Sequence, residues 1–339
     1  MRKVLYVPLD DRDCNYQFPW LLSQMTEGLE LLRPPYEWMG FLKKPADREK
    51  IWEWLFEQAG ECDYAILSVD TLVYGNIIGS RIHTYSMEEC RETMDRFRQL
   101  KKQNPQLHIH AFNLAARVAA YNDNHEDPEY WQEYGYDIWR YTWLWDKKKR
   151  AGISEKEAEA LESLQKKIPK EIMQDFLERR KTDRFVNLTS VELVRENVFD
   201  ILTVPKDDTA EFGYAALDQM AIMQKAEEEQ LTDRVYCYPG ADEVGSVIFA
   251  RVFCLIKQYQ PIFYVRYSSL TGSSVIPLYE DRPLGESIKW QILSAGGICS
   301  ETPADADCML AVNAPGTCQI ESANQKNGRN FASDNAANP

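Results

Sequence analysis

Eight short apolar runs lie between residues 3 and 312, and most of them are separated by longer stretches with helical periodicity. Short apolar runs bounded by Gly, Pro, Asn or Asp are typical of buried β-strands. The expected strands cover residues 3–8, 29–33, 63–69, 107–112, 198–204, 234–238, 262–267 and 308–312. Because strands that alternate with helices form parallel sheets covered by those helices, this pattern predicts an α/β fold.

Helical periodicity, with apolar residues three or four positions apart, is clearest at 88–101, 215–229, 244–257 and 284–294. A charged stretch at about 146–185 interrupts the alternation. Ser154, with Glu157 three residues later, is typical of a capping box at a helix start. We therefore expect one α/β domain over residues 1–316 with a charged helical insertion at about 146–185.

The number of strands favours a (β/α)8 barrel-like parallel sheet, incomplete at the C-terminus, and the alternative is an open doubly wound sheet. Both architectures place binding sites at the carboxyl ends of their strands. Residues 317–339 are polar and rich in Asn, which predicts a disordered tail. Since no covering helix follows the eighth strand, the alternative is that the chain is a truncated version of a longer one.

The overall charge and the cysteines narrow the class of protein. The 339 residues include 53 Asp plus Glu against 39 Lys plus Arg, a formal charge of −14, which disfavours nucleic-acid binding. No apolar stretch approaches the roughly 20 residues of a membrane helix. The first apolar run stops at Asp10, too early for a signal peptide. Eight dispersed cysteines without a Cys-x-x-Cys pair indicate a reduced, cytoplasmic protein.

Carboxylate pairs follow a proline at the end of three expected strands. The segments are Val7-Pro8-Leu9-Asp10-Asp11, Val204-Pro205-Lys206-Asp207-Asp208 and Tyr238-Pro239-Gly240-Ala241-Asp242-Glu243. Asp70 likewise follows the third strand. Since parallel strands end at one edge of a sheet, we expect a shared acidic pocket there. Crowded carboxyl groups shift one another's pKa values, as acid/base cleavage of a glycosidic bond requires.

Part of this set also has a structural interpretation. Asp is a favoured helix N-cap, and Asp208 with Glu211 three residues later fits that role. Four arginines lie near the same edge: Arg12, Arg81, Arg117 and Arg266. We interpret Arg12 as a residue that balances the charge of the neighbouring carboxylates and holds them in place. Arg81 and Arg117 are left open between charge balance and recognition of an acidic or hydroxyl-rich substrate.

Other known site patterns are absent from the sequence. It contains no phosphate loop, no Gly-x-Gly-x-x-Gly and no Gly-x-Ser-x-Gly. His108 and His110 share one face of a strand, and we interpret them as core residues, with no metal-ligating residue assigned. The alternative is a Mg²⁺ or Ca²⁺ ion bound by a cluster of Asp10, Asp11, Asp207 and Asp208.

Several of these segments resemble a bacterial family of unknown function, DUF4127. They are residues 7–15, 70–81, 113–122, 206–209 and 240–245, and the resemblance spans roughly residues 3–316. The resemblance implies that members of this family have longer chains, and it implies no particular activity. Gly240-Ala241-Asp242-Glu243 is also similar to the signature of family 20 glycoside hydrolases. That likeness implies that Glu243 is the general acid and Asp242 orients the substrate's acetamido group, although Tyr238 stands where that family has His or Asn.

The leading hypothesis is therefore a glycoside-hydrolase-like enzyme for a small-molecule or oligosaccharide substrate, including N-acetylated sugars. Its expected catalytic residues are Glu243, Asp242 and Asp207. The expected substrate-binding residues are Asp10, Asp11, Asp70, Tyr74, Arg81, Asn113, Arg117, Asp208 and Arg266. The alternatives are a Mg²⁺- or Ca²⁺-dependent hydrolase or lyase, and a non-catalytic carbohydrate- or acid-binding protein.

Overall fold

The computed structural model describes residues 1–207, 210–278 and 280–316. These residues form two compact units that meet along the chain between Ile248 and Phe249. The single domain expected over residues 1–316 stays a prediction. The expected polar tail, 317–339, lies outside the described residues, as do Asp208 and Thr209.

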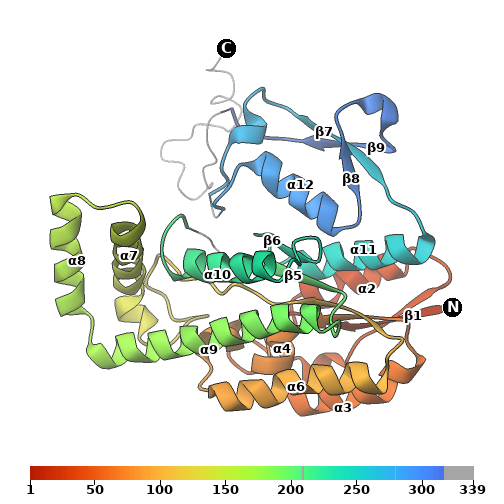
Figure 1. Cartoon of the computed structure of the whole chain (residues 1–339), viewed down its shortest axis with the longest axis horizontal. Coiled ribbons are helices and arrows are strands. Elements are labelled where there is room, and N and C mark those ends of the chain that lie inside the picture. The colour runs from red at the N-terminus through yellow and green to blue at the C-terminus, as the bar shows by residue number, and fades with distance from the viewer. Residues whose placement is uncertain (208–209, 279, 317–339) are drawn as a thin grey trace. The chain divides into compact units, whose positions relative to one another are not determined.

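The first unit contains a six-stranded parallel sheet (Figure 1). Its strands are β1 (Arg2–Val7), β2 (Leu29–Leu32), β3 (Tyr64–Ser68), β4 (His108–Phe112), β5 (Ile201–Lys206) and β6 (Val235–Pro239). Their order is β2-β1-β3-β4-β5-β6, and all neighbours are parallel. The chain first adds β2 on one side of β1 and then β3 on the other. In open sheets, ligands bind outside the carboxyl ends of the strands at such a reversal.

Both faces of this sheet are buried, as in a doubly wound α/β fold. Leu5, Val7 and Leu67 on one face belong to the main apolar core. Val4 and Tyr6 on the other face are fully buried as well. The glycine at position 245 is required there, because a Cβ atom would collide with the Tyr6 hydroxyl. Burial on both faces explains why these strands are apolar runs rather than alternating ones.

Helices between the strands cover the sheet. They are α1 (Asp13–Tyr16), α2 (Phe18–Ser23), α3 (Arg48–Gln58), α4 (Val69–Tyr74), α5 (Ile77–Ile82), α6 (Met87–Gln103), α7 (Trp131–Arg150), α8 (Glu155–Lys167), α9 (Lys170–Arg195) and α10 (Tyr214–Glu228). α3, α6, α9 and α10 all contribute to the main core. α11 (Val244–Lys257) begins in the first unit and ends in the second.

The helices α7, α8 and α9 stand between β4 and β5, where the charged insertion was expected. They extend from Trp131 to Arg195, beyond the expected bounds at both ends. The capping box of Ser154 and Glu157 is confirmed at the start of α8. The next helix, α10, begins at Tyr214 behind Gly213, whose φ is 106°. The capping interpretation of Asp208 concerns a residue outside the described part of the chain.

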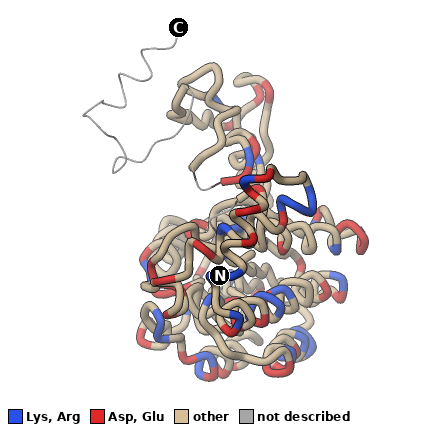
Figure 2. The backbone as a smooth tube through the Cα atoms, turned by 90° about the vertical axis from the view of Figure 1, so that its left-hand side faces the viewer, with Lys and Arg blue, Asp and Glu red and all other residues tan. Residues whose placement is uncertain are grey.

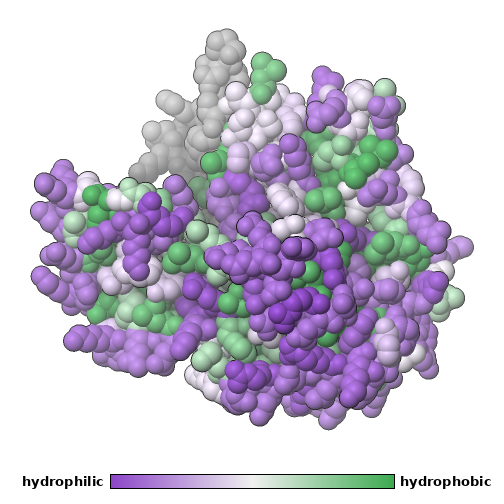
Figure 3. Space-filling model, in the orientation of Figure 1, coloured by the Kyte–Doolittle hydropathy of each residue, from purple (hydrophilic) through white to green (hydrophobic). Residues whose placement is uncertain are grey.

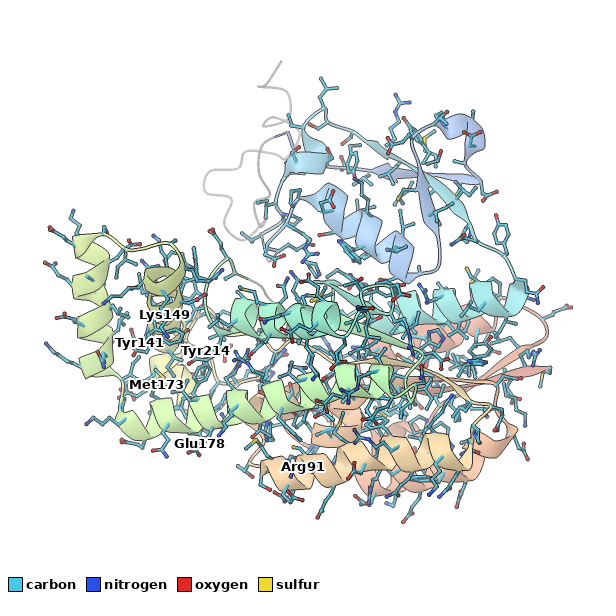
Figure 4. The ribbon with its side chains drawn as sticks, in the orientation of Figure 1. Arg91, Tyr141, Lys149, Met173, Glu178 and Tyr214 are labelled. Carbon is cyan, nitrogen blue, oxygen red and sulfur yellow. The ribbon has the colours of Figure 1, made fainter. Side chains whose placement is uncertain are left out.

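Aromatic rings join the insertion to α10. Trp145 of α7 stacks on Tyr214 with ring centroids 5.8 Å apart and planes at 7°. Phe176 of α9 meets the same tyrosine edge-on at 5.7 Å. Lys149 Nζ lies 3.6 Å from the centroid of Trp145, and Figure 4 labels this lysine and Tyr214. The insertion is therefore anchored by ring packing as well as by the chain itself.

The second unit contains a separate parallel sheet of three strands, β8 (Ile298–Ser300), β7 (Ile262–Tyr267) and β9 (Cys308–Val312), in the order β8-β7-β9. α12 (Leu284–Ser294) connects β7 to β8. The predicted (β/α)8 barrel is wrong, because the described strands form two open sheets. In a barrel wound in chain order β1 would pair with β2 and with the last strand, whereas here it pairs with β2 and β3.

Surface charge is mixed rather than segregated. Lys and Arg lie beside Asp and Glu along the outer helices of the first unit (Figure 2). Over α7, α8 and α9, hydrophobic surface is broken up by hydrophilic side chains (Figure 3). Within the described part of the chain, no helix has both the length and the apolar character that crossing a membrane requires.

Candidate functional site

The loop after β1 holds the first carboxylate of the expected site in a tight set of hydrogen bonds. Arg12 donates from Nε and Nη2 to Asp10 Oδ2 at 2.9 and 2.7 Å. The Arg12 backbone N–H and Asn15 Nδ2 donate to Asp10 Oδ1 at 3.1 and 2.9 Å. Asp10 is buried, so these contacts brace the loop and agree with the charge-balance interpretation of Arg12.

Arg12 also connects this loop to the end of β6. Its Nη2 atom donates to Asp242 Oδ1 at 2.7 Å, and Asp242 is exposed. β1 and β6 are separated in the sheet by β3, β4 and β5. The connection from β6 to α11 therefore returns across the carboxyl edge, and it places Asp242 beside the β1–β3 reversal.

A second group of ion pairs is centred on Arg81 of α5. Its side chain is only 5% exposed, and it donates from Nη2 to Asp207 Oδ2 at 2.7 Å and from Nη1 to Glu126 Oε2 at 2.9 Å. Asp207 follows β5, while Glu126 lies in the loop that follows β4. A planar guanidinium with two terminal nitrogens suits such a bridge between two carboxylates.

Arg117 extends the same group. Its Nη2 atom donates to Asp127 Oδ2 at 2.9 Å and lies 3.3 Å from Glu126 Oε2. Burial raises the pKa of Glu126, whereas the positive charges of Arg81, Arg117 and Arg12 lower it. The combined effect of the arginines is the larger one, so the pKa of Glu126 lies below its usual range. The influence of Arg12 shows that the two groups of ion pairs act on one another.

We name the combined set the edge cluster. It comprises Asp10, Asp11, Arg12, Arg81, Arg117, Glu126, Asp127, Asp207 and Asp242. Within it, burial and the nearby charge of Asp10 raise the pKa of Asp11, whereas arginines lower that of Glu126. Carboxyl groups whose pKa values move in opposite directions at one site can serve as proton donor and as ionised partner.

Asp70 and Asn113 lie beneath the edge rather than on it. Asp70 Oδ2 accepts the Leu114 N–H at 2.9 Å, and Asn113 Nδ2 lies 3.3 Å from both carboxyl oxygens. Asn113 Oδ1 accepts from Asn187 Nδ2 at 2.7 Å and from Ser190 Oγ at 3.2 Å. Burial raises the pKa of Asp70 to about 7. These residues hold the loop that carries Arg117 and Glu126.

Tyr74 is also buried, so its ring does not face an open site in this structure. It stacks on His83 with ring centroids 4.5 Å apart. His83 Nε2 lies 3.0 Å from Asp183 Oδ1, while His83 Nδ1 accepts the Tyr85 N–H at 3.2 Å. This tautomer leaves the Nε2 proton to donate to Asp183, and the three groups form a packed network behind α5.

A comparison with protein families decides what kind of chain this is. The family described as "Protein of unknown function (DUF4127)" matches residues 4–338, nearly the whole chain. The chain belongs to the DUF4127 family. This match confirms the resemblance noted from the sequence. A search of curated proteins found no match.

The remaining expected residues of this DUF4127 protein are distributed differently. Glu243 directly precedes α11 and is partly exposed, and its carbonyl oxygen accepts the Val247 N–H at 3.0 Å. Arg266 lies on β7 of the second unit. Asp208 lies outside the described residues. Among the residues that the structure describes, no three His, Cys, Asp or Glu side chains are grouped to hold a metal ion.

Three residues at this edge were missed by reasoning from the sequence. Glu126 and Asp127 complete the arginine pairs, and Lys206 is buried at the end of β5. A signal for the first two was present, since Glu126-Asp127 directly precedes Pro128 in the loop after an expected strand. The long loop from β4 to α7 hid their proximity to the other carboxylates.

Proposed function

We propose that this DUF4127 protein is a hydrolase that cleaves glycosidic bonds at the carboxyl edge of its six-stranded sheet. Glu243 is the general acid, and Asp207 and Glu126 are ionised carboxylates that stabilise the positive charge developing on the sugar. Asp242 orients the substrate. The observation that supports this proposal is that arginines hold three of these carboxylates at one edge of the sheet: Arg81 pairs with Asp207 and Glu126, and Arg12 pairs with Asp242, the neighbour of Glu243.

The charges of the edge cluster favour a neutral, hydroxyl-rich substrate. The cluster has six carboxyl groups and three guanidinium groups, and each arginine is engaged by at least one carboxylate. Adding Lys206 still leaves an acidic excess, which would repel a phosphate or carboxylate substrate. Carboxylate oxygens accept several hydrogen bonds each, so they can bind sugar hydroxyls while paired with arginine.

The test compares glycosides with good and poor leaving groups. Wild-type protein should hydrolyse members of an aryl glycoside panel that includes N-acetylated sugars. The Glu243→Gln variant should lose about 10²- to 10⁴-fold in kcat with a poor leaving group, because that oxygen needs a proton. With a dinitrophenyl leaving group the loss should be much smaller, since that group departs unprotonated. Glu88→Gln, which removes an exposed carboxylate that pairs with Arg91 on α6, is the matched control.

Each result discriminates between the hypotheses. Unchanged turnover by a folded Glu243→Gln protein contradicts the acid assignment. Binding of sugars without turnover by the wild type supports the carbohydrate-binding alternative. Activity that is lost with EDTA and restored by Mg²⁺ or Ca²⁺ supports the metal-dependent alternative, which requires Asp208 in addition to the described carboxylates.

A further inference from the structure

A cavity of about 390 Å³ in the first unit is lined in part by residues that directly follow members of the edge cluster along the chain. This size falls in the lower part of the range for small-molecule sites, roughly 300–1,000 Å³. Ile82, Pro128 and Ile172 supply apolar walls, and the ring of Tyr130 adds an aromatic one. These residues come from the end of α5, the loop before α7, and α9.

The chain connects this cavity directly to the edge cluster. Ile82 follows Arg81, which bridges Asp207 and Glu126. Pro128 follows Asp127, the partner of Arg117. The same two segments therefore contribute residues to the cavity and to the edge cluster. A ligand in the cavity contacts residues that are next in the chain to Arg81 and Asp127.

A fixed group of polar side chains forms one side of the cavity. The Tyr130 hydroxyl donates to Asp175 Oδ2 at 2.8 Å, and Arg179 Nη1 donates to that hydroxyl at 3.1 Å. Arg179 Nη2 donates to Asp175 at 2.8 and 3.0 Å, and its Nε donates to the His83 carbonyl at 2.9 Å. The Arg179 side chain is 9% exposed, so this wall is held in place before any ligand arrives.

Glu129, which also lines the cavity, is held by two hydrogen bonds. Lys43 Nζ donates to Glu129 Oε1 at 2.5 Å, and Asn124 Nδ2 donates to Glu129 Oε2 at 2.5 Å. Glu171 adds a third carboxylate to those of Glu129 and Asp175, against the two cations Lys43 and Arg179. An anion is therefore disfavoured. Apolar walls with one tyrosine ring and positioned carboxylates match the C–H faces and hydroxyls of a sugar.

We propose that this cavity binds a second sugar unit of the substrate that is cleaved at the edge cluster, so that the substrate is an oligosaccharide. This inference rests on the proposed function. It predicts that affinity and kcat/KM rise with chain length, because the second unit contributes binding energy away from the scissile bond.

The test fills the cavity from α9. Ile172→Trp places a large ring in it, and the control Leu177→Trp makes a comparable change on the same helix. Leu177 lines a different cavity of about 410 Å³ together with Tyr141 and Met173, which Figure 4 labels. Calorimetric titration uses one to three linked units of N-acetylglucosamine and of glucose. Thermal unfolding shows whether each variant is folded. If Ile172→Trp does not fold, Ile172→Phe, which adds a smaller ring, replaces it.

We expect at least one trisaccharide to bind wild type at least tenfold more tightly than its monosaccharide. Ile172→Trp should abolish that gain and Leu177→Trp should keep it. Equal affinity for all lengths, an unchanged gain in Ile172→Trp, or no binding of any sugar overturns the subsite. Hydrolysis of methylumbelliferyl monosaccharides measured in parallel tests the proposed function separately. Length-dependent binding without hydrolysis keeps the subsite and rejects the hydrolase, whereas hydrolysis without length dependence does the reverse.

Discussion

At the scale of single residues, Asp70 shows how burial sets the protonation of a carboxyl group. It is 1% exposed, and burial raises its pKa to about 7. Since the unfolded pKa is about 3.9, the folded state holds this proton over a range where the unfolded state has lost it. The stability that Asp70 contributes is therefore fully present below pH 3.9 and is lost as the pH rises through 7.

We predict that Asp70→Asn removes this pH dependence. Relative to wild type, the free energy of unfolding of the variant should rise by about 2–3 kcal/mol between pH 5 and pH 8. Urea unfolding at several pH values measures the difference. Asp305→Asn removes an exposed carboxyl group elsewhere and serves as the control. A constant difference between Asp70→Asn and wild type would show that Asp70 does not titrate in this range.

Whereas burial raises the pKa of Asp70, the charge of Arg81 lowers the pKa of Glu126 at the edge of the sheet. In the Arg81→Gln variant the pKa of Glu126 should rise, because burial remains while the nearest opposing positive charge is lost. The variant should also be less stable by roughly 3 kcal/mol, since Asp207 and Glu126 lose a buried partner.

Carbon NMR titration of the glutamate carboxyl groups measures this pKa, with Glu126→Gln to assign the signal. Arg91→Gln is the control, because Arg91 lies on α6 and pairs with an exposed glutamate (Figure 4). A Glu126 titration that is identical in wild type and Arg81→Gln would refute the electrostatic account of the edge cluster.

At the scale of elements, Gly75 ends α4 and directs the chain toward α5, which carries Arg81. Its φ of 100° is unfavourable for other residues, and a Cβ atom there would collide with Pro45. Gly28 has a similar φ of 81° but open space around it. Gly28→Ala should therefore cost about 1 kcal/mol for the backbone conformation, and Gly75→Ala roughly 2 kcal/mol more for the collision. Chemical denaturation of both variants checks this, and equal losses would contradict it.

Most element positions were predictable because their signals are local. The eight expected strands all occur, and the capping box at Ser154 fixes the start of α8. β8 was missed because three residues, Ile298–Ser300, are too few to show a period. The N-cap of α10 is Gly213, with a positive φ of 106°, and no capping signal of the Ser154 kind marks it in the sequence.

At the scale of the whole molecule, the net charge of −14 sets the interactions with other polymers. We predict no shift of a 20-base-pair DNA duplex in a gel at 50 mM salt, because an acidic protein gains nothing from releasing the counterions of DNA. Lysozyme, a basic protein, is a suitable positive control. A shift by this protein that disappears as salt is raised would contradict the prediction.

The sequence by itself determined the places of eight of the nine described strands along the chain and the parallel α/β class. It also indicated that Asp10, Asp207 and Asp242 lie at one edge of the sheet. Hydrophobic period, turn residues and capping residues act over a few positions, so they can be read from the chain. The choice of open sheets over a barrel, and the contacts between edge loops, came only from the tertiary structure. Arg12 and Asp242 are 230 positions apart, and Arg81 and Asp207 are 126 apart. Such pairs form only after strand order has brought their loops together, because no local signal specifies which strands will pair.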